Sequence, residues 1–549
     1  MARESCTGMA EYRYYQRGRR FLSYMAASNL AALALGESIP YRQVLSRSRR
    51  LWDALRTLIR LGQKPVDLQP LPPNPNYLWF GGLHLQPSEA TGHFAVIGST
   101  GSGKTLTLDS FEESALRYFR PGADQRALIF DVKREKYSKL QNLNLPVEIH
   151  LMDPFDTRGV SWRIRADVTT PAEAAQAAAC LIQSGKNEGD NQFWIELCRS
   201  VVAAVFENLA ILYPATWTLR DALLILRSRA RLAHFLMARS ETAHVWEDAS
   251  VDEKTCSNLM VSLKSHLKKL EVVAALWQHQ AKSISLKEWV KSDSILLITS
   301  HPKYSASLQL VHQALFDLLT DLVLSESDSR LRRTYFFLDE AKDLGRLPKL
   351  PRLANLGRSK GTLISLGLQS IEGFNAVYTE PVASEILGNC RNKSFLRTDS
   401  QTTANWIEKH FGQVEWLVEQ VTHSSSNGKG GYSSGTSTSH TRRRESILMA
   451  SEVMNYGPPN DTQPVVLFND IPSIGCYVAT IARDAFIENL RPANPAIPNV
   501  IEAPDKHQRL TDWQKSDAKR LKLPADLLQL SDEDKKLLLD QLENLNRDE

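Results

Sequence analysis

Short runs of apolar residues, each bounded by polar ones, recur along this chain. They predict strands at residues 93–97, 127–130, 147–151, 295–298, 334–338, 362–368 and 393–396. Uninterrupted apolar runs of this length are typical of parallel strands that are buried on both faces. The stretches between them place apolar residues at helical spacing. The pattern therefore predicts an α/β fold with a doubly wound parallel sheet.

Residues 166–290 have a different pattern. Their apolar residues, many of them Ala and Leu, recur at helical spacing, and no strand pattern interrupts them. The segments with the strongest helical pattern are 172–184, 193–212, 219–237 and 259–277. Because strand patterns precede and follow this region, we expect an all-helical domain inserted into the α/β core.

The two ends of the chain and one internal segment depart from both patterns. A Pro-rich connector at 64–77 follows a basic N-terminal region, which we expect to be helical. From residue 424 to 444 the chain is mainly Ser, Gly, Thr and Asn, ending in three arginines, and such a composition favours a mobile loop. A helical tail should include an amphipathic helix from Ser531 with Leu538, Leu542 and Leu545 on one face. The expected segments are 1–70 (basic, helical), 71–165 (core, first part), 166–290 (inserted helices), 291–500 (core, second part) and 501–549 (helical tail).

Composition changes this picture little. The 549 residues are 42% hydrophobic and 23% charged, as in a globular protein, and the formal net charge is only +4. The six cysteines form no C-x-x-C pair, which favours free thiols in a reducing compartment. No apolar run is long enough for a membrane-spanning helix or a signal peptide. We therefore expect a cytoplasmic protein that is peripheral, if it meets a membrane at all.

One segment carries a strong chemical signal. Residues 98–105 fit the P-loop pattern G-x-x-x-x-G-K-S/T between a predicted strand and a predicted helix. Such a loop turns its backbone N–H groups inward around phosphates, while the Lys side chain reaches the β- and γ-phosphates and the Ser/Thr hydroxyl binds Mg²⁺. The sequence thus predicts binding of ATP and Mg²⁺ through Gly98, Ser99, Thr100, Gly101, Ser102, Gly103, Lys104 and Thr105, with Thr105 as a metal ligand.

A second segment offers the acidic residues that a nucleotide-hydrolysing site needs besides the P-loop. The apolar strand predicted at 334–338 ends in Asp339 and Glu340. Asp339 fits the Walker B residue that holds Mg²⁺, and Glu340 fits the base that polarises the attacking water. Gln369 follows the predicted strand 362–368 and fits a sensor of the γ-phosphate. Together with the long spacing between the two motifs, this predicts a RecA-like ATPase core rather than a small-molecule kinase or a GTPase.

The order of these motifs resembles that of the type IV secretion coupling proteins, the conjugative DNA-transport ATPases of the FtsK–HerA superfamily. Residues 338–348 (LDEAKDLGRLP), 356–361 (LGRSKG) and 366–370 (LGLQS) carry most of the likeness. Further matching segments are 129–133 (IFDVK), 152–156 (MDPFD) with Trp162, 193–194 (FW), 387–390 (LGNC) and 393–397 (KSFLR). The resemblance covers roughly residues 90–485.

The resemblance implies a hexameric ring that moves DNA and links relaxase-bound DNA to a type IV secretion channel. It also implies that Arg358 reaches the neighbouring subunit's nucleotide as an arginine finger, with Arg391 and Arg397 as competing candidates. Family members usually begin with two transmembrane helices, whereas this sequence shows none. Membrane attachment through a partner, peripheral contact through the basic N-terminal region and a soluble motor all stay open. So do two other functions: a DNA pump without a secretion partner, and a nucleotide-switched adaptor for protein substrates.

Overall fold

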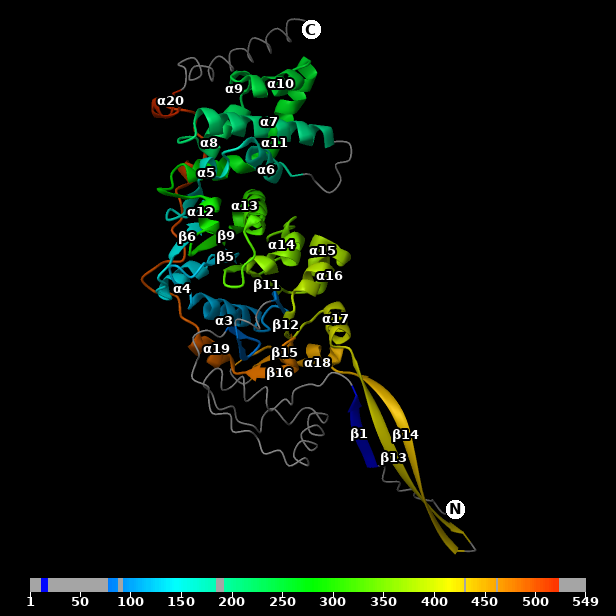
Figure 1. Ribbon diagram of the computed structural model, residues 1–549. Coiled ribbons are helices and arrows are strands. Elements are labelled where there is room, and N and C mark those ends of the chain that lie inside the picture. The colour runs from blue at the N-terminus through cyan, green and yellow to red at the C-terminus, as the bar shows by residue number, and fades with distance from the viewer. Residues whose placement is uncertain are drawn as a thin grey trace. The chain divides into compact units, whose positions relative to one another are not determined.

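The structure, a computed structural model, describes residues 11–17, 78–86, 92–183, 192–428, 431–460 and 463–522. Figure 1 labels its elements. The chain forms two compact units. Met1–Ala115 and Gly367–Leu490 make up the P-loop unit, and Leu116–Leu366 and Arg491–Glu549 make up the insertion unit. Each has its own strands, helices and apolar core.

The insertion unit contains parallel strands in the order β11-β10-β5-β9-β6. Their bounds are Thr362–Leu368 (β11), Arg333–Leu338 (β10), Gln125–Asp131 (β5), Ser294–Thr299 (β9) and Glu148–Met152 (β6). β9 and β11 are buried along their whole length, as expected of parallel strands covered on both faces. The last two residues of β11 belong to the P-loop unit. The predicted α/β fold and its parallel strands are confirmed.

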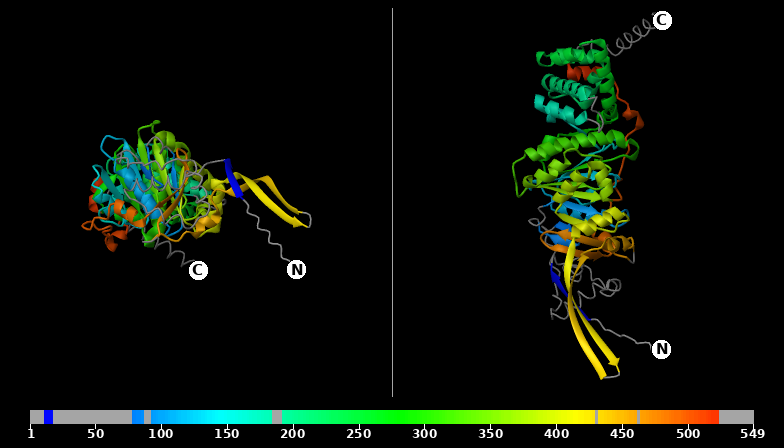
Figure 2. Two further views of the ribbon diagram at one scale, coloured as in Figure 1. Left: turned by 90° about the horizontal axis from the view of Figure 1, so that it is seen from below. Right: turned by 90° about the vertical axis from the view of Figure 1, so that its right-hand side faces the viewer.

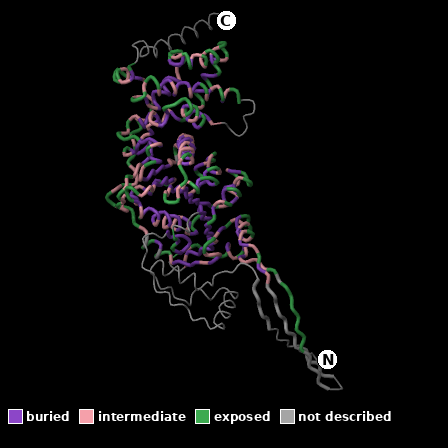
Figure 3. The backbone as a smooth tube through the Cα atoms, viewed as in Figure 1, coloured by how far each residue is buried: buried purple, intermediate pink, exposed green. Residues whose placement is uncertain are grey.

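The helices around these strands are α4 (Lys136–Asn142), α12 (Leu286–Val290), α13 (Ser305–Ser325) and α14 (Leu350–Leu356). Buried positions, purple in Figure 3, mark the strands and the inward helix faces. α13 buries an unusual pair of polar side chains, His312 and Asp317, along with its apolar ones. His312 packs edge-on against Phe130 of β5, with ring centroids 5.4 Å apart.

The inserted region is helical, as its sequence pattern predicts. Its helices are α5 (Ile164–Asp167), α6 (Pro171–Leu181), α7 (Gln192–Leu212), α8 (Leu219–Leu226), α9 (Arg229–Met237), α10 (Ser240–Ala249) and α11 (Glu253–Trp277). The single helical pattern over 219–237 becomes two helices, because the Ser228 hydroxyl caps α9 by accepting from the Arg231 N–H. Two short parallel strands were not predicted: β7 (Val160–Trp162) lies just before the region, and β8 (Lys282–Ile284) lies inside the bounds 166–290 that were expected to be all-helical.

In the P-loop unit, strands run in the order β16-β15-β12-β4. Their bounds are Gly475–Ile481 (β16), Val465–Ile471 (β15), Asn392–Phe395 (β12) and Phe94–Ile97 (β4). Among these four strands, β12 pairs with β4 in parallel, whereas β15 pairs antiparallel with both β12 and β16. The sequence pattern did not predict β15 and β16. The other elements are β2 (Leu78–Phe80), β3 (Leu83–Leu85), α3 (Lys104–Leu116), α15 (Ile371–Tyr378), α16 (Glu380–Asn389), α17 (Gln401–Phe411), α18 (Ala450–Asn455) and α19 (Arg483–Asn489). The core centres on three buried rings, Phe80, Phe94 and Phe111.

The prediction of a mobile loop over 424–444 is wrong. This segment lies within a long antiparallel hairpin of β13 (Gln413–Gly428) and β14 (Gly431–Ser446), which extends beyond β15 and β16 in Figure 2. A Ser/Gly/Thr composition excludes a buried core but not a hydrogen-bonded ladder between two main chains. The described residues 436–442 of β14 are indeed exposed.

Little of the predicted N-terminal helical region falls among the described residues. The described part, β1 (Glu11–Arg17), is a strand rather than a helix, and it pairs with β13. The remaining residues of 1–70 lie outside the described residues, as does the helix predicted from Ser531. Within the described ranges, no helix is long and apolar enough to cross a membrane.

In the described part of the predicted tail, residues 501–522, two short helices are joined by irregular segments. This part includes η4 (Asp505–Gln508) and α20 (Lys515–Leu521), and it packs along the insertion unit. Just before the tail, the Ser138 hydroxyl of α4 donates to the Asn494 carbonyl at 2.9 Å. Near its end, the indole N–H of Trp513 donates to Asp221 of α8 at 2.9 Å. Polar contacts of this kind hold irregular segments in place.

Candidate nucleotide-binding site

The P-loop joins β4 to α3 in the way its motif predicts. Gly101 and Gly103 have φ values of +76° and +98°, which L side chains rarely adopt. A Cβ atom on Gly98 would lie 2.6 Å from the Ser102 hydroxyl oxygen and 2.8 Å from the Leu396 Cβ. The loop therefore needs glycine at these positions for its own shape.

Main-chain hydrogen bonds fix the loop to two other strands of its unit. The Gly98 N–H donates to the Leu368 carbonyl at the end of β11, and the Ser99 N–H donates to the Arg397 carbonyl just after β12, both at 3.0 Å. The Ser99 hydroxyl in turn accepts from the Asp399 N–H at 2.9 Å. The segment after β12 is thus part of the site. The sequence predicts a strand at 393–396 and offers Arg397 as a finger candidate, but no sequence pattern predicts that this segment contacts the P-loop.

The residues of the loop fit a bound phosphate chain. Lys104, at the start of α3, is only 5% exposed, and Thr105 beside it is half-buried. The Ser102 hydroxyl is buried and has no hydrogen-bond partner among the described residues. A buried hydroxyl without a partner is costly, so a ligand at this loop would relieve that cost.

The Walker B segment lies in the insertion unit, directly after β10. Asp339 and Glu340 are both half-buried, and an Asp339 carboxylate oxygen accepts from the Glu340 N–H at 2.9 Å. Glu340 has a φ of +56°, and its carbonyl accepts from the Asp343 N–H at 2.8 Å to close a turn. A non-glycine residue in this region carries strain of about 1–3 kcal/mol, which is typical of functional positions. No sequence pattern indicated this strain.

Gln369 directly follows Leu368, whose carbonyl accepts from Gly98, and its side chain is exposed. The next residues form a network that sequence reasoning missed. Glu372 accepts from Thr403 at 2.6 Å and also from Ser400. Burial alone would raise the pKa of Glu372, but these hydroxyl hydrogen bonds outweigh it and lower the pKa. An ionised Glu372 therefore holds α15 against α17 beside the P-loop.

The three candidate finger arginines differ in their surroundings. Arg358 lies on the exposed side of η3 (Gly357–Lys360) in the insertion unit. Arg391 is exposed just before β12. Arg397 forms an ion pair with Asp399, and its carbonyl already binds the P-loop of the same chain. All three arginines stay candidates for the finger; Arg397 differs from Arg358 and Arg391 in that its side chain forms an ion pair with Asp399.

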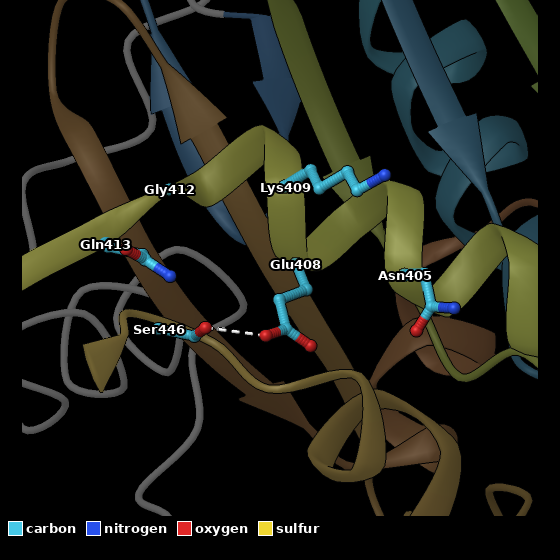
Figure 4. Close-up of a pocket in the computed structure, with 6 residues that line it drawn as sticks. All are labelled: Asn405, Glu408, Lys409, Gly412, Gln413 and Ser446. Carbon is cyan, nitrogen blue, oxygen red and sulfur yellow. Dashed lines mark hydrogen bonds between the residues drawn. The ribbon is translucent and has the colours of Figure 1, made fainter. Parts of the chain in front are cut away.

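The P-loop unit also has a hollow of about 470 Å³ at the base of the hairpin, and its lining is polar (Figure 4). Its central carboxylate, Glu408, accepts from the Ser446 hydroxyl at 2.6 Å and from the Ala450 N–H at 2.9 Å. Glu408 therefore ties α17 to the end of β14 and the start of α18. These two contacts fix the base of the hairpin to α17.

Comparison with known proteins decides the family. A family model described as "Type IV secretion-system coupling protein DNA-binding domain" matches residues 77–475, well over half of the chain. This chain belongs to the type IV secretion-system coupling protein family. The match includes the P-loop, the Walker B segment and the whole helical insertion.

One curated relative is the coupling protein TraD of Escherichia coli strain K12. It is 22% identical over 393 residues, which are 70% of this chain and 50% of TraD. The chain thus spans about half the length of this curated relative.

Solved structures of the coupling protein TrwB have the same fold. An unbound form of the chain TrwBdeltaN70 aligns with a TM-score of 0.58 at 16% identity, covering 82% of this chain and 94% of the TrwBdeltaN70 chain. TrwB in complex with ADP and Mg²⁺ aligns with a TM-score of 0.58 at 17% identity, covering 81% and 94%. The fold of this coupling protein is therefore that of TrwB: a P-loop α/β core with a helical insertion.

Proposed function

We propose that this coupling protein binds ATP with Mg²⁺ at residues 98–105 and hydrolyses it. Lys104 would bind the β- and γ-phosphates, and Thr105 would hold the metal together with Asp339. The observation that carries this proposal is the anchored loop, in which Leu368 and Arg397 fix the first two residues through their carbonyls. TrwB, which shares the fold, has been solved with ADP and Mg²⁺ and with a non-hydrolysable ATP analogue.

In the proposed hydrolysis, Glu340 polarises the attacking water as general base, and Gln369 senses the γ-phosphate. The strained backbone at Glu340 supports this role, because such strain persists where the surrounding structure positions one side chain for chemistry. Bound Mg²⁺ would supply charge neutralisation for the phosphates. The protein's own part is to hold Lys104 and Thr105 at the start of α3 and the two carboxylates at the end of β10.

We further propose that the active form is a homo-hexamer in which Arg358 completes the neighbouring subunit's site. The surface around Arg358 supports a subunit contact. Leu356, two residues earlier, is 51% exposed, and Leu331 is 87% exposed. The loop that carries Leu331 is fixed to η3, because the Ser329 N–H donates to the Ser359 carbonyl at 2.9 Å. Exposed large apolar side chains beside a finger arginine fit a face that another copy covers.

DNA is the proposed substrate of the motor, and the matched family model is itself described as a DNA-binding domain. We propose contacts mainly to phosphates, with weak sequence preference and strong salt dependence. The cellular role would be to link a relaxase and its DNA to a type IV secretion channel, at the cytoplasmic face of the membrane, with membrane contact supplied by a partner. TraD, which shares the family, is named as a coupling protein.

The test is ATP hydrolysis by the purified chain with and without single- or double-stranded DNA, between about 50 and 200 mM salt. DNA should stimulate hydrolysis, and the stimulation should fall as salt rises. Lys104→Ala should bind nucleotide poorly, whereas Glu340→Gln should bind ATP and keep it uncleaved. If DNA does not change the rate of hydrolysis at any salt concentration, the proposed ATPase activity is retained and the proposed DNA translocation is rejected.

A further inference from the structure

A small cavity of about 50 Å³ lies within the insertion unit, among residues of α5, α8, α11, β7 and β8. It contains space for several water molecules, since one water needs about 10–15 Å³ by this measure. Its lining includes three arginines and three tryptophans: Arg163, Arg165, Arg220, Trp162, Trp217 and Trp277. No Asp or Glu side chain contributes to the lining.

Two of the arginines already have anionic partners. Arg163 donates to Glu288 at 2.8 Å, and Arg220 pairs with Asp517 at 3.2 Å. Arg165 is different, because no carboxylate among the described residues pairs with it. Burial lowers the pKa of Arg165, and the positive charges of Arg163 and Arg520 lower it further. Arg165 thus brings to the lining a half-buried positive charge that no carboxylate pairs with among the described residues.

Unused hydrogen-bond donors also gather here. The indole N–H groups of Trp217 and Trp277 are buried without an acceptor among the described residues, as is the Nε–H of Arg163. Trp217 is fully buried and Trp277 is 6% exposed. Four described tryptophans have a buried indole N–H without an acceptor, and two of them line this one cavity. Buried donors without acceptors are costly, so a group that accepts from several of them would be stabilised.

We propose that this cavity is an anion site that takes a single phosphate group, held by Arg165, by the Nε–H of Arg163 and by the indole N–H groups of Trp217 and Trp277. A tetrahedral oxyanion supplies only acceptors and negative charge, and it matches the excess charge and the unused donors. Arginine is the side chain best suited to phosphate oxygens. The lining belongs to the insertion unit alone, and none of it is P-loop, so the inference does not rest on the proposed function. The phosphate could be free inorganic phosphate or the terminal phosphate of a nucleic acid.

The experiment is isothermal titration calorimetry of the full chain with inorganic phosphate, in phosphate-free buffer, after the P-loop has been saturated with ADP and Mg²⁺. The ADP titration itself reports on the P-loop, so a failure there is seen separately. We expect one phosphate per chain. Arg165→Gln should weaken its binding roughly tenfold to a hundredfold, the effect of one charge-assisted contact. Arg330→Gln, an exposed arginine of the same unit outside the cavity, should bind phosphate like the unaltered chain.

Thermal unfolding distinguishes a lost site from a damaged fold. Because Arg165 lies near two other positive charges, Arg165→Gln should be at least as stable as the unaltered chain in phosphate-free buffer. Added phosphate should raise the Tm of the unaltered chain and not that of the variant. Trp277→Phe, which keeps a ring of similar character but removes one donor, should show an intermediate effect. Equal phosphate responses in the unaltered chain and Arg165→Gln, or none in either, would mean that only water fills the cavity and would overturn the proposal.

A second titration identifies the source of the phosphate. A short DNA oligonucleotide with a 5′-phosphate is compared with the same oligonucleotide without it. An advantage for the phosphorylated oligonucleotide that disappears in Arg165→Gln assigns the site to nucleic-acid ends. No such advantage, with Arg165-dependent binding of inorganic phosphate retained, assigns it to the free ion.

Discussion

The main-chain N–H of Ser99 donates to the carbonyl oxygen of Arg397, although the two residues are almost three hundred positions apart in the chain. One belongs to the P-loop and the other follows β12. This bond, with the one from Gly98 to Leu368, means that the shape of the loop depends on where two neighbouring strands end. Displacing either strand end should therefore alter nucleotide affinity without touching the motif itself.

The first prediction concerns the space at Gly98. Gly98→Ala should lower nucleotide affinity more than tenfold, because the new Cβ would overlap Ser102 and Leu396 and force the loop to shift. Fluorescent-ADP binding measures the effect. Gly388→Ala is the matched control, since a Cβ there meets nothing within 4 Å and helix α16 gains a better helix former. Normal ADP affinity in Gly98→Ala would show that the loop tolerates a shift at this position.

The second prediction concerns the strain at Glu340. Glu340→Gly should raise the Tm, by the equivalent of about 1 kcal/mol, because glycine adopts a positive φ without cost. The same variant should lose hydrolysis. Glu340→Gln should lose hydrolysis equally but leave the Tm unchanged, since it keeps the strained backbone. A fall in Tm for Glu340→Gly would show that the side chain contributes more to stability than the backbone strain costs.

The third prediction tests whether Arg358 acts in trans. Arg358→Ala should bind ATP but not hydrolyse it, and Lys104→Ala should also be inactive. Mixing the two variants should restore part of the activity, because some shared sites then have an intact Lys104 from one copy and an intact Arg358 from the other. Arg391→Ala is the control and should keep its own activity. If mixing restores nothing while Arg391→Ala is inactive, the finger is Arg391.

The fourth prediction concerns the pH dependence of stability around Asp317. Burial raises the pKa of Asp317 to about 6, against the opposing effect of Lys349. Ionisation is thus harder in the folded state, so the contribution of this residue to stability is greatest below its ordinary pKa and is lost as pH rises towards and above about 6. Asp317→Asn should therefore raise the free energy of unfolding at pH 8 by about 1–3 kcal/mol and have little effect at pH 4.

Thermal unfolding across this pH range is the measurement. Asp321→Asn is a useful control with the opposite sign, because Asp321 forms an ion pair with Lys349 and its loss should destabilise the protein at pH 8. A stability gain for Asp317→Asn that is the same at pH 4 and pH 8 would rule out the proposed titration.

The sequence predicts correctly those strands and helices whose residues carry the pattern of apolar positions within the element itself. All seven predicted strands are present, because most of them are short apolar runs that the fold buries, as in β4, β9 and β11. β15 and β16 were missed because their apolar runs end in polar residues that pair across strands: Asn469 accepts from Ser394 of β12 at 2.7 Å, which no local pattern shows. The hairpin was mistaken for a loop because composition reports on burial and not on main-chain pairing. The roles assigned to Asp339, Glu340, Arg358 and Gln369 stay predictions.

The burial of Trp513 against Asp221 has a consequence for how this protein is made. The two residues are 292 positions apart, so at about 5–20 residues per second the ribosome needs roughly 15–60 s to deliver the tryptophan after the aspartate. During that interval the inserted helices exist without the segment that covers them. Nascent chains at this stage should therefore be the ones that chaperones and proteases recognise.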